Sequence, residues 1–144
     1  MKALYKYLIA ILVLSVGLSC GGDDAPPSVQ EQAFERLSGA WDLTQGGSIV
    51  VDGVDASLNY PGFTLSFTDG AFNTTNAGDL FDATGTWEWA DTDAGTIQLG
   101  DGKLITIINL TETEFEFSFQ FNGTGGQAND IDGTAGNYVI TVNK

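Results

Sequence analysis

The chain has 144 residues, with 19 acidic residues against five basic ones, no histidine and a single cysteine. Its length favours one domain, and its net charge of −14 disfavours contact with nucleic-acid phosphates. Without histidine there is no Ser-His-Asp catalytic site, and without a second cysteine there is no intramolecular disulfide or zinc-binding thiolate cluster. We therefore expect a protein that is not an enzyme and that carries no cofactor or metal.

The first residues have the pattern of a secretory signal peptide. Lys2 and Lys6 give a basic start, and residues 7–19 carry no charge. This uncharged stretch is shorter than the roughly 20 apolar residues that a transmembrane helix requires. Small residues at its end complete the pattern, so we assign residues 1–19 to a signal peptide and exclude them from the fold.

Cys20 follows this segment directly, in the run Gly17-Leu18-Ser19-Cys20-Gly21-Gly22-Asp23-Asp24. The run resembles the lipobox of bacterial lipoproteins, in which this cysteine is acylated, for instance with palmitate, and becomes the new N-terminus. The resemblance implies lipid attachment at Cys20 and anchoring to the outer membrane. Gly-Gly-Asp-Asp is also similar to the tether that directs some lipoproteins to the cell surface, although a solvated linker looks the same. The alternative for Cys20 is ordinary signal cleavage that leaves a free thiol.

After the cysteine, residues 20–27 are rich in Gly, Asp and Pro and are predicted to form a flexible, lipidated tether. Residues 28–144 then form the folded domain. Ser28 and Glu31 match a capping box, and apolar residues follow at helical spacing until Gly39. These features predict one short helix over residues 29–37.

Beyond Gly39 the chain is predicted to be all-β. Short runs rich in Thr, Ile, Val and aromatic residues alternate with turn dipeptides such as Asp69-Gly70 and Asp101-Gly102. The predicted strands cover residues 40–44, 48–51, 63–68, 71–75, 84–90, 96–99, 103–110, 114–121 and 138–142. The first two are either one bent strand broken at Gly46-Gly47, which gives eight strands joined by short turns, or two separate strands, which gives nine.

Two-residue turns fix which residues face each other on neighbouring strands. A turn at Asp69-Gly70 places Phe67 opposite Phe72, and one at Asp101-Gly102 places Leu99 opposite Leu104 and Ile97 opposite Thr106. A turn at Glu112-Thr113 pairs the next two strands. The expected pairs are Leu110 with Phe115, Ile108 with Phe117, Thr106 with Phe119 and Leu104 with Phe121. This register puts Ile105 and Ile107 on the outer face, to be covered by Phe34 of the helix or by a partner protein.

An antiparallel meander of eight strands has two exposed edges unless it closes into a barrel. Closure would pair the last strand, with Tyr138, Ile140 and Val142, against the first, with Trp41 and Leu43. An open sheet or a two-sheet sandwich is the alternative. We predict the closed, up-and-down barrel.

The short helix leading into Gly39-Ala40-Trp41 resembles the opening motif of the lipocalins, whose tryptophan closes one end of an eight-stranded barrel. With Gly85-Thr86-Trp87-Glu88-Trp89, the chain is similar to the lipocalin-like domains of small Gram-negative lipoproteins. The resemblance covers residues 37–144. The late arginine that packs on this tryptophan in the family is missing, because no arginine occurs after Arg36.

The inward aromatic residues are the candidate binding site for a small apolar or amphipathic ligand in the barrel mouth. They are Trp41, Phe63, Phe67, Trp87, Trp89, Phe117 and Phe119. An eight-stranded barrel is wide enough either for its own side chains or for one small ligand. The alternative is a self-filled barrel that serves as an accessory subunit of the cell envelope, contacting a protein through Ile105 and Ile107 or a glycan through Trp87 or Trp89.

Overall fold

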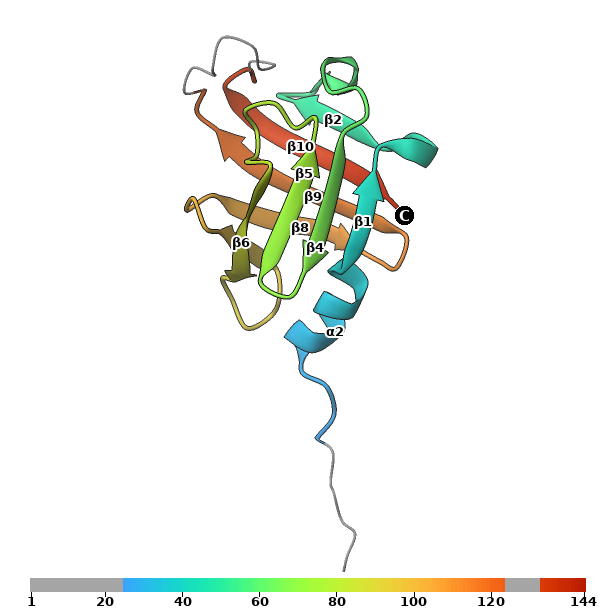
Figure 1. Ribbon diagram of the computed structural model, residues 1–144, viewed down its shortest axis with the longest axis vertical. Helices are drawn as coiled ribbons and strands as arrows, with labels where there is room; N and C mark the ends of the chain where they lie inside the picture. Colours follow the sequence, from blue (N-terminus) through green and yellow to red (C-terminus); the bar gives the residue numbers. More distant parts are fainter. Residues whose placement is uncertain (1–24, 124–132) are drawn as a thin grey trace, which may run out of the picture.

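The computed structural model describes residues 25–123 and 133–144, and it shows an all-β fold with one short N-terminal helix (Figure 1). The described elements are α2 (Val29–Leu37), β1 (Gly39–Asp42), η1 (Thr44–Gly46), β2 (Ser48–Val51), β3 (Val54–Asp55), η2 (Ser57–Asn59), β4 (Thr64–Thr68), β5 (Ala71–Thr75), β6 (Thr84–Trp89), β7 (Thr96–Leu99), β8 (Leu104–Leu110), β9 (Glu114–Phe121) and β10 (Gly136–Asn143). The antiparallel strands follow the order β1-β4-β5-β6-β7-β8-β9-β10-β2-β3, and β1 also pairs with β10.

The sheet closes on itself, as predicted, and the first strand is bent. β1 pairs with β4, while β2 pairs with β10, so the two segments are the halves of one strand interrupted by η1. One further pair, Asp42 with Asn143, joins β1 to β10. β2 therefore contributes more to the closure than the stretch around Trp41 does. The result is an eight-stranded, up-and-down, lipocalin-like barrel in which β4 to β6 lie in front of β8 to β10 (Figure 1).

The helix forms where the capping box predicts it. Ser28 Oγ accepts the backbone N–H of Glu31 at 3.1 Å, and Glu31 Oε2 accepts the backbone N–H of Ser28 at 2.6 Å. α2 covers one end of the barrel (Figure 1) and buries Ala33 and Leu37. Trp41 Nε1 donates to the Leu37 carbonyl oxygen at 2.8 Å, which fixes the helix to the start of β1.

A lysine packs on Trp41, the position at which an arginine packs on the corresponding tryptophan in the lipocalins that the chain resembles. Lys144 Nζ lies 4.2 Å from the centroid of the Trp41 ring and donates to the carbonyl oxygens of Arg36 and Ser38, at 2.6 and 2.7 Å. The ammonium group therefore satisfies carbonyls at the C-terminus of α2, where a positive charge is favourable, while it contacts the tryptophan face.

The pairing of strand β8 with its two neighbours differs from the predicted register. Phe67 does pair with Phe72, and Leu110 with Phe115. The turn after β7 is one residue longer than predicted, however, so Ile97 pairs with Ile105 and Gln98 with Leu104. An irregularity between Ile107 and Asn109 then restores the register with β9, after Ile107 has paired with Phe117.

Five predicted pairs were therefore wrong: Leu99–Leu104, Ile97–Thr106, Ile108–Phe117, Thr106–Phe119 and Leu104–Phe121. So was the placement of Ile105 and Ile107 on the outer face, since Ile105 is buried and Ile107 packs against the core. Leu104 and Ile108 lie outside instead, with exposed fractions of 54% and 52%. The physical cause is the left-handed backbone of Gly102 (φ +90°), which adds a residue to the turn.

Aromatic side chains fill the barrel interior. Phe67 on β4 reaches Phe115 on β9, across the barrel, with ring centroids 6.0 Å apart, and Trp41 lies 5.7 Å from the same ring. Phe117 stacks on Phe115 at 4.5 Å and meets Phe81 at 6.3 Å. Because side chains from opposite walls touch, the lumen is a packed core.

The end of the barrel away from α2 is closed by the β3–β4 and β5–β6 connections. They insert Tyr60, Leu80 and Phe81, all of them buried. Lys103 Nζ caps this end from the β7–β8 turn, 4.6 Å from the centroid of the Phe81 ring, and donates to the Leu80 carbonyl oxygen. Burial lowers the pKa of this ammonium group, although Asp101 at 3.8 Å opposes the shift.

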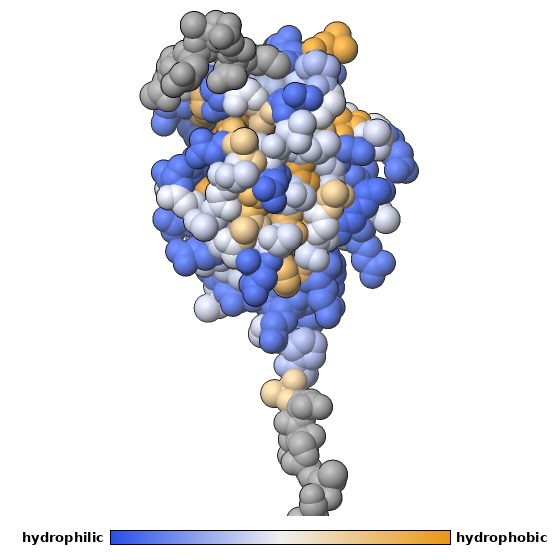
Figure 2. Space-filling view, viewed as in Figure 1, coloured by the Kyte–Doolittle hydropathy of each residue, from blue (hydrophilic) through white to orange (hydrophobic). Residues whose placement is uncertain are grey.

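The outer surface contrasts with this interior. In the space-filling view, most of the visible face is hydrophilic or neutral, and orange surface is confined to separate spots (Figure 2). The alternation of buried and exposed residues along β4 accounts for this: Leu65 and Phe67 point inward, whereas Ser66 and Thr68 point outward. Large apolar side chains are thus mostly withdrawn from solvent.

Candidate functional site

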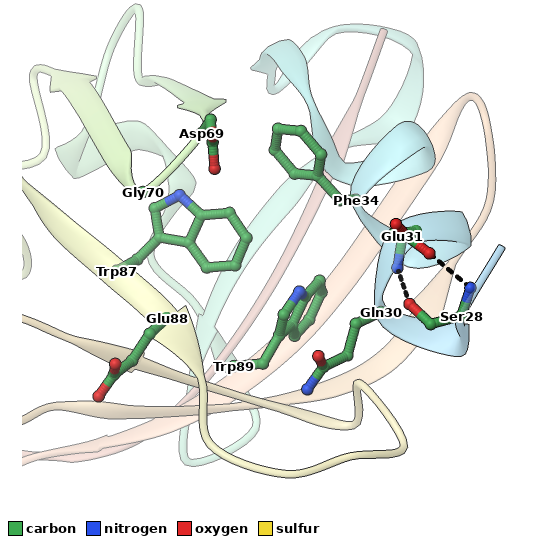
Figure 3. Close-up of a pocket in the computed structure, with 9 residues that line it drawn as sticks. All are labelled: Ser28, Gln30, Glu31, Phe34, Asp69, Gly70, Trp87, Glu88 and Trp89. Atoms are coloured by element: carbon green, nitrogen blue, oxygen red, sulfur yellow. Dashed lines mark hydrogen bonds between the residues drawn. The ribbon is translucent and has the colours of Figure 1, made fainter.

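A cleft of about 660 Å³ opens between the first turns of α2, the β4–β5 turn and strand β6 (Figure 3). We call it the aromatic cleft, because three ring side chains form its apolar wall. Its lining residues are Ser28, Gln30, Glu31, Phe34, Asp69, Gly70, Trp87, Glu88 and Trp89. Its size is within the usual range for small-molecule sites in proteins.

The helix side of the cleft is held by two contacts. Gln30 Nε2 donates to the Asp91 carbonyl oxygen at 2.8 Å, which ties α2 to the loop after β6. Phe34 packs against Trp87 with ring centroids 5.9 Å apart. Together with the capping box at Ser28, these contacts set the position of the helix over the barrel end.

Trp87 is the fixed floor of the cleft. Its Nε1 donates to the Thr68 carbonyl oxygen at 2.8 Å, its ring meets Phe67 edge-on at 5.6 Å, and only 7% of the residue is exposed. Trp89 stands two residues further along the same face of β6 and meets Trp87 at 5.1 Å and 89°. Trp89 is only partly buried, so its ring borders the open space (Figure 3).

The rim of the cleft is acidic. Asp69 lies on the turn side of the rings and Glu31 on the helix side, and Glu88 stands at the outer edge (Figure 3). The hydrogen bonds from Ser28 lower the pKa of the Glu31 carboxyl below its ordinary value, so this group stays ionised at neutral pH. No lysine or arginine is among the described residues that line the cleft.

The basic residues lie elsewhere on the described surface. Arg36 and Lys144 line a separate hollow with Glu35 and Glu112, and Lys103 caps the opposite end of the barrel. In residues 25–123 and 133–144 no group of three or more His, Cys, Asp or Glu side chains is arranged to hold a metal ion. No helix in these two ranges is both long and apolar enough to cross a bilayer.

The structure separates the predicted ligand-binding residues into two groups. Five of them are buried in the packed lumen, namely Trp41, Phe63, Phe67, Phe117 and Phe119. Trp87 and Trp89 meet at the aromatic cleft. Cys20, the predicted lipid-attachment residue, lies outside the described residues, as do the predicted signal peptide and the first part of the tether.

Sequence reasoning assigned none of the helix residues to the site. Phe34 was one of two alternatives for covering Ile105 and Ile107 on the outside of the barrel, the other being a partner protein, but it faces Trp87 instead. Gln30 carried no signal at all. Helical spacing shows that Phe34 belongs to the apolar face of α2, whereas the strand that it meets depends on how the helix docks.

Comparisons with known proteins gave no match to this chain. No family model matches the chain, and no match was found among curated proteins or solved structures. The lipocalin-like description therefore rests on the strand pairing, and the site rests on its own geometry.

Proposed function

We propose that this chain is a non-enzymatic, lipid-anchored protein of the outer membrane that binds a small amphipathic molecule in the aromatic cleft. The observation that carries the proposal is the aromatic cleft itself, an open hollow of about 660 Å³ beside a lumen that is already full. Apolar pockets with a few convergent polar groups are the usual form of a small-molecule site.

Binding at the cleft, instead of inside the barrel, follows from the packing. A ligand in the lumen would have to displace rings such as Phe115 and Phe117, which have no exposed surface. Both ends are also closed, by α2 on one side and by Tyr60, Leu80 and Phe81 on the other. The cleft needs no such rearrangement, because Trp89 and Phe34 already border open space.

The first prediction concerns Trp89. The uncharged dye N-phenyl-1-naphthylamine should bind the protein saturably, with an increase in dye fluorescence. Trp89→Ala should weaken this binding about tenfold or more, since the lost ring contact corresponds to about 1.4 kcal/mol. Ile108→Ala is the matched control, because it removes a half-exposed apolar side chain on the outer face of β8. Equal dye affinity in all three proteins would contradict the proposal, and so would a failure of both this dye and choline to bind.

The anchor places the cleft close to the membrane. Ser28 lines the cleft and is eight positions after Cys20. An extended chain of that length spans about 28 Å at most. An acylated Cys20 would therefore hold the cleft within that distance of the bilayer surface, and the acidic chain itself would have little attraction to anionic head groups.

The second prediction is that Cys20→Ser releases the protein from membranes. Cells that express the unaltered chain should incorporate labelled palmitate into it and retain it in the outer-membrane fraction. The serine variant should lose the label and appear in a soluble fraction, since two or three acyl chains provide the stable attachment. A labelled serine variant, or one that stays with the membrane, would argue against the lipid anchor.

A further inference from the structure

We propose that the ligand of the aromatic cleft is a small organic cation, an ammonium group carried on a compact apolar body and taken from solution. This inference rests on the proposed function, because it specifies the chemistry of the same site. Three features of the described residues carry it: the arrangement of the rings, the charge of the rim and the placement of the protein's own cations.

The rings approach the cleft from different directions. Trp87 and Trp89 are perpendicular, at 89°, while Phe34 is tilted by 32° from Trp87 and comes from the helix (Figure 3). The neighbouring rings touch, with centroids 5.9 and 5.1 Å apart, and Trp87 is almost fully buried, so the rings form a corner whose partly exposed sides are Phe34 and Trp89, and not one broad flat platform of the kind on which a sugar ring stacks. The faces of aromatic rings are electrostatically negative, and rings that meet at an angle attract quaternary ammonium groups.

The rim adds formal negative charge on both sides of the rings. Asp69, on the β4–β5 turn, points its carboxylate towards the rings, whereas Glu31, on the first turn of α2, turns its carboxylate back to the Ser28 backbone N–H and adds negative charge only at the edge of the cleft (Figure 3). No basic side chain among the described lining residues offsets them. An anionic ligand would be repelled here, and a neutral one would gain no charge–charge attraction from the carboxylates, whereas a cation is attracted by both rings and rim.

The protein itself shows how its aromatic rings attract cations. Lys103 Nζ lies 4.6 and 5.5 Å from the ring centroids of Phe81 and Phe119, and Lys144 Nζ lies 4.2 Å from that of Trp41. Across residues 25–123 and 133–144, the ring–cation contacts involve these two lysines alone. The described residues supply no cation to the three rings of the cleft, so a cationic ligand would meet no competing ammonium group there.

The test compares two probes of the same shape that differ in charge. Choline carries a trimethylammonium group, and 3,3-dimethyl-1-butanol carries the uncharged tert-butyl group in its place. Titrations followed by tryptophan fluorescence and calorimetry should show choline binding at least tenfold more tightly than the alcohol. Asp69→Asn should weaken choline binding several-fold and leave the alcohol unaffected. Asparagine keeps the turn intact, since Asn-Gly is as suitable for a hairpin as Asp-Gly.

Asp82→Asn is the matched control, because it removes one exposed acid on the β5–β6 connection, at the other end of the barrel. It should bind choline as the unaltered protein does. Equal affinity for choline and the alcohol would overturn the cation assignment, and so would tighter binding of an uncharged methyl glycoside. Co-sedimentation with phosphatidylcholine vesicles is the third comparison. If the protein binds these vesicles more tightly than its affinity for free choline predicts, the ligand is not taken from solution and that part of the assignment is wrong.

The two proposals fail in distinguishable ways. If the uncharged dye binds at Trp89 but choline does not bind, the cation assignment is wrong and the cleft remains a binding site. If neither dye nor choline binds, the cleft is not a binding site and both proposals are wrong.

Discussion

Replacing Phe117 with alanine is expected to lower the free energy of unfolding by about 3–5 kcal/mol, the usual cost of removing a fully buried phenylalanine. Phe117 has no exposed surface, stacks on Phe115 at 4.5 Å and on Phe119 at 6.3 Å, and meets Phe81 at 6.3 Å. Rings from several walls surround it, so the lumen cannot collapse around the missing side chain. Urea denaturation would measure the loss.

The same variant tests whether the lumen is full. An apolar cavity the size of a phenylalanine ring is expected to remain dry and to bind benzene or xenon. The unaltered protein should bind neither inside the barrel. Ile108→Ala is again the control, since its half-exposed side chain should cost less than about 1 kcal/mol. A comparably small loss for Phe117→Ala, or benzene bound inside the unaltered barrel, would show that the interior is loosely packed.

Gly47→Ala is expected to destabilise the barrel by about 2–3 kcal/mol through overpacking. Gly47 follows η1, where the first strand bends towards β10, and its φ of −60° is open to any residue. Space is the constraint, because an added Cβ would lie 2.6 Å from Leu43 Cα and 2.8 Å from the Thr141 carbonyl oxygen. Both neighbours are backbone atoms, so relief requires β2 to move away from β10.

Thermal and urea unfolding of Gly47→Ala would measure this effect. Gly95→Ala provides the comparison, since a Cβ there would lie 3.4 Å from Asp91 Oδ2, at the distance of an ordinary contact. Its stability should stay within about 0.5 kcal/mol of the unaltered protein. If Gly47→Ala and Gly95→Ala have the same free energy of unfolding, the close approach of Gly47 to Leu43 and Thr141 does not contribute to the closure of the barrel.

Much of the fold could be predicted from the sequence, because the features that determine the helix start and the strand faces involve residues close together in the chain. The capping box of Ser28 and Glu31 fixes where the helix begins, and period-two alternation sets the inner face of β9 correctly. The bend at Gly46-Gly47 was also visible, since two adjacent glycines interrupt a strand pattern. The closure that this bend permits followed from the cost of leaving sheet edges unpaired.

The register of strand β8 could not be predicted from such local signals. Its sequence, Leu104-Ile105-Thr106-Ile107-Ile108, is apolar on both faces, so alternation does not distinguish the inner face from the outer one. An extra residue in the turn at Gly102 and an irregularity near Ile108 shift the register in compensating ways. Both neighbouring strands therefore keep the predicted inner face while β8 is reversed over most of its length.

The candidate site was predictable only in part, and for a physical reason. Trp87 and Trp89 share a strand face, so their proximity is encoded locally. The remaining wall comes from Phe34 and Gln30, whose positions depend on how α2 docks on the barrel end. Lys144 illustrates the same limit, since its contact with Trp41 joins residues from opposite ends of the folded domain.

The central claim is that ligands bind at the aromatic cleft and not in the lumen. An NMR titration of the isotopically labelled protein with N-phenyl-1-naphthylamine tests it most directly. We predict that the indole N–H of Trp89 and the amides around Phe34 shift, while the methyl groups of the lumen residues Ile49, Ile97 and Ile140, which have no exposed surface, stay unchanged. Shifts centred on those isoleucine methyls, with Trp89 unaffected, would contradict the account.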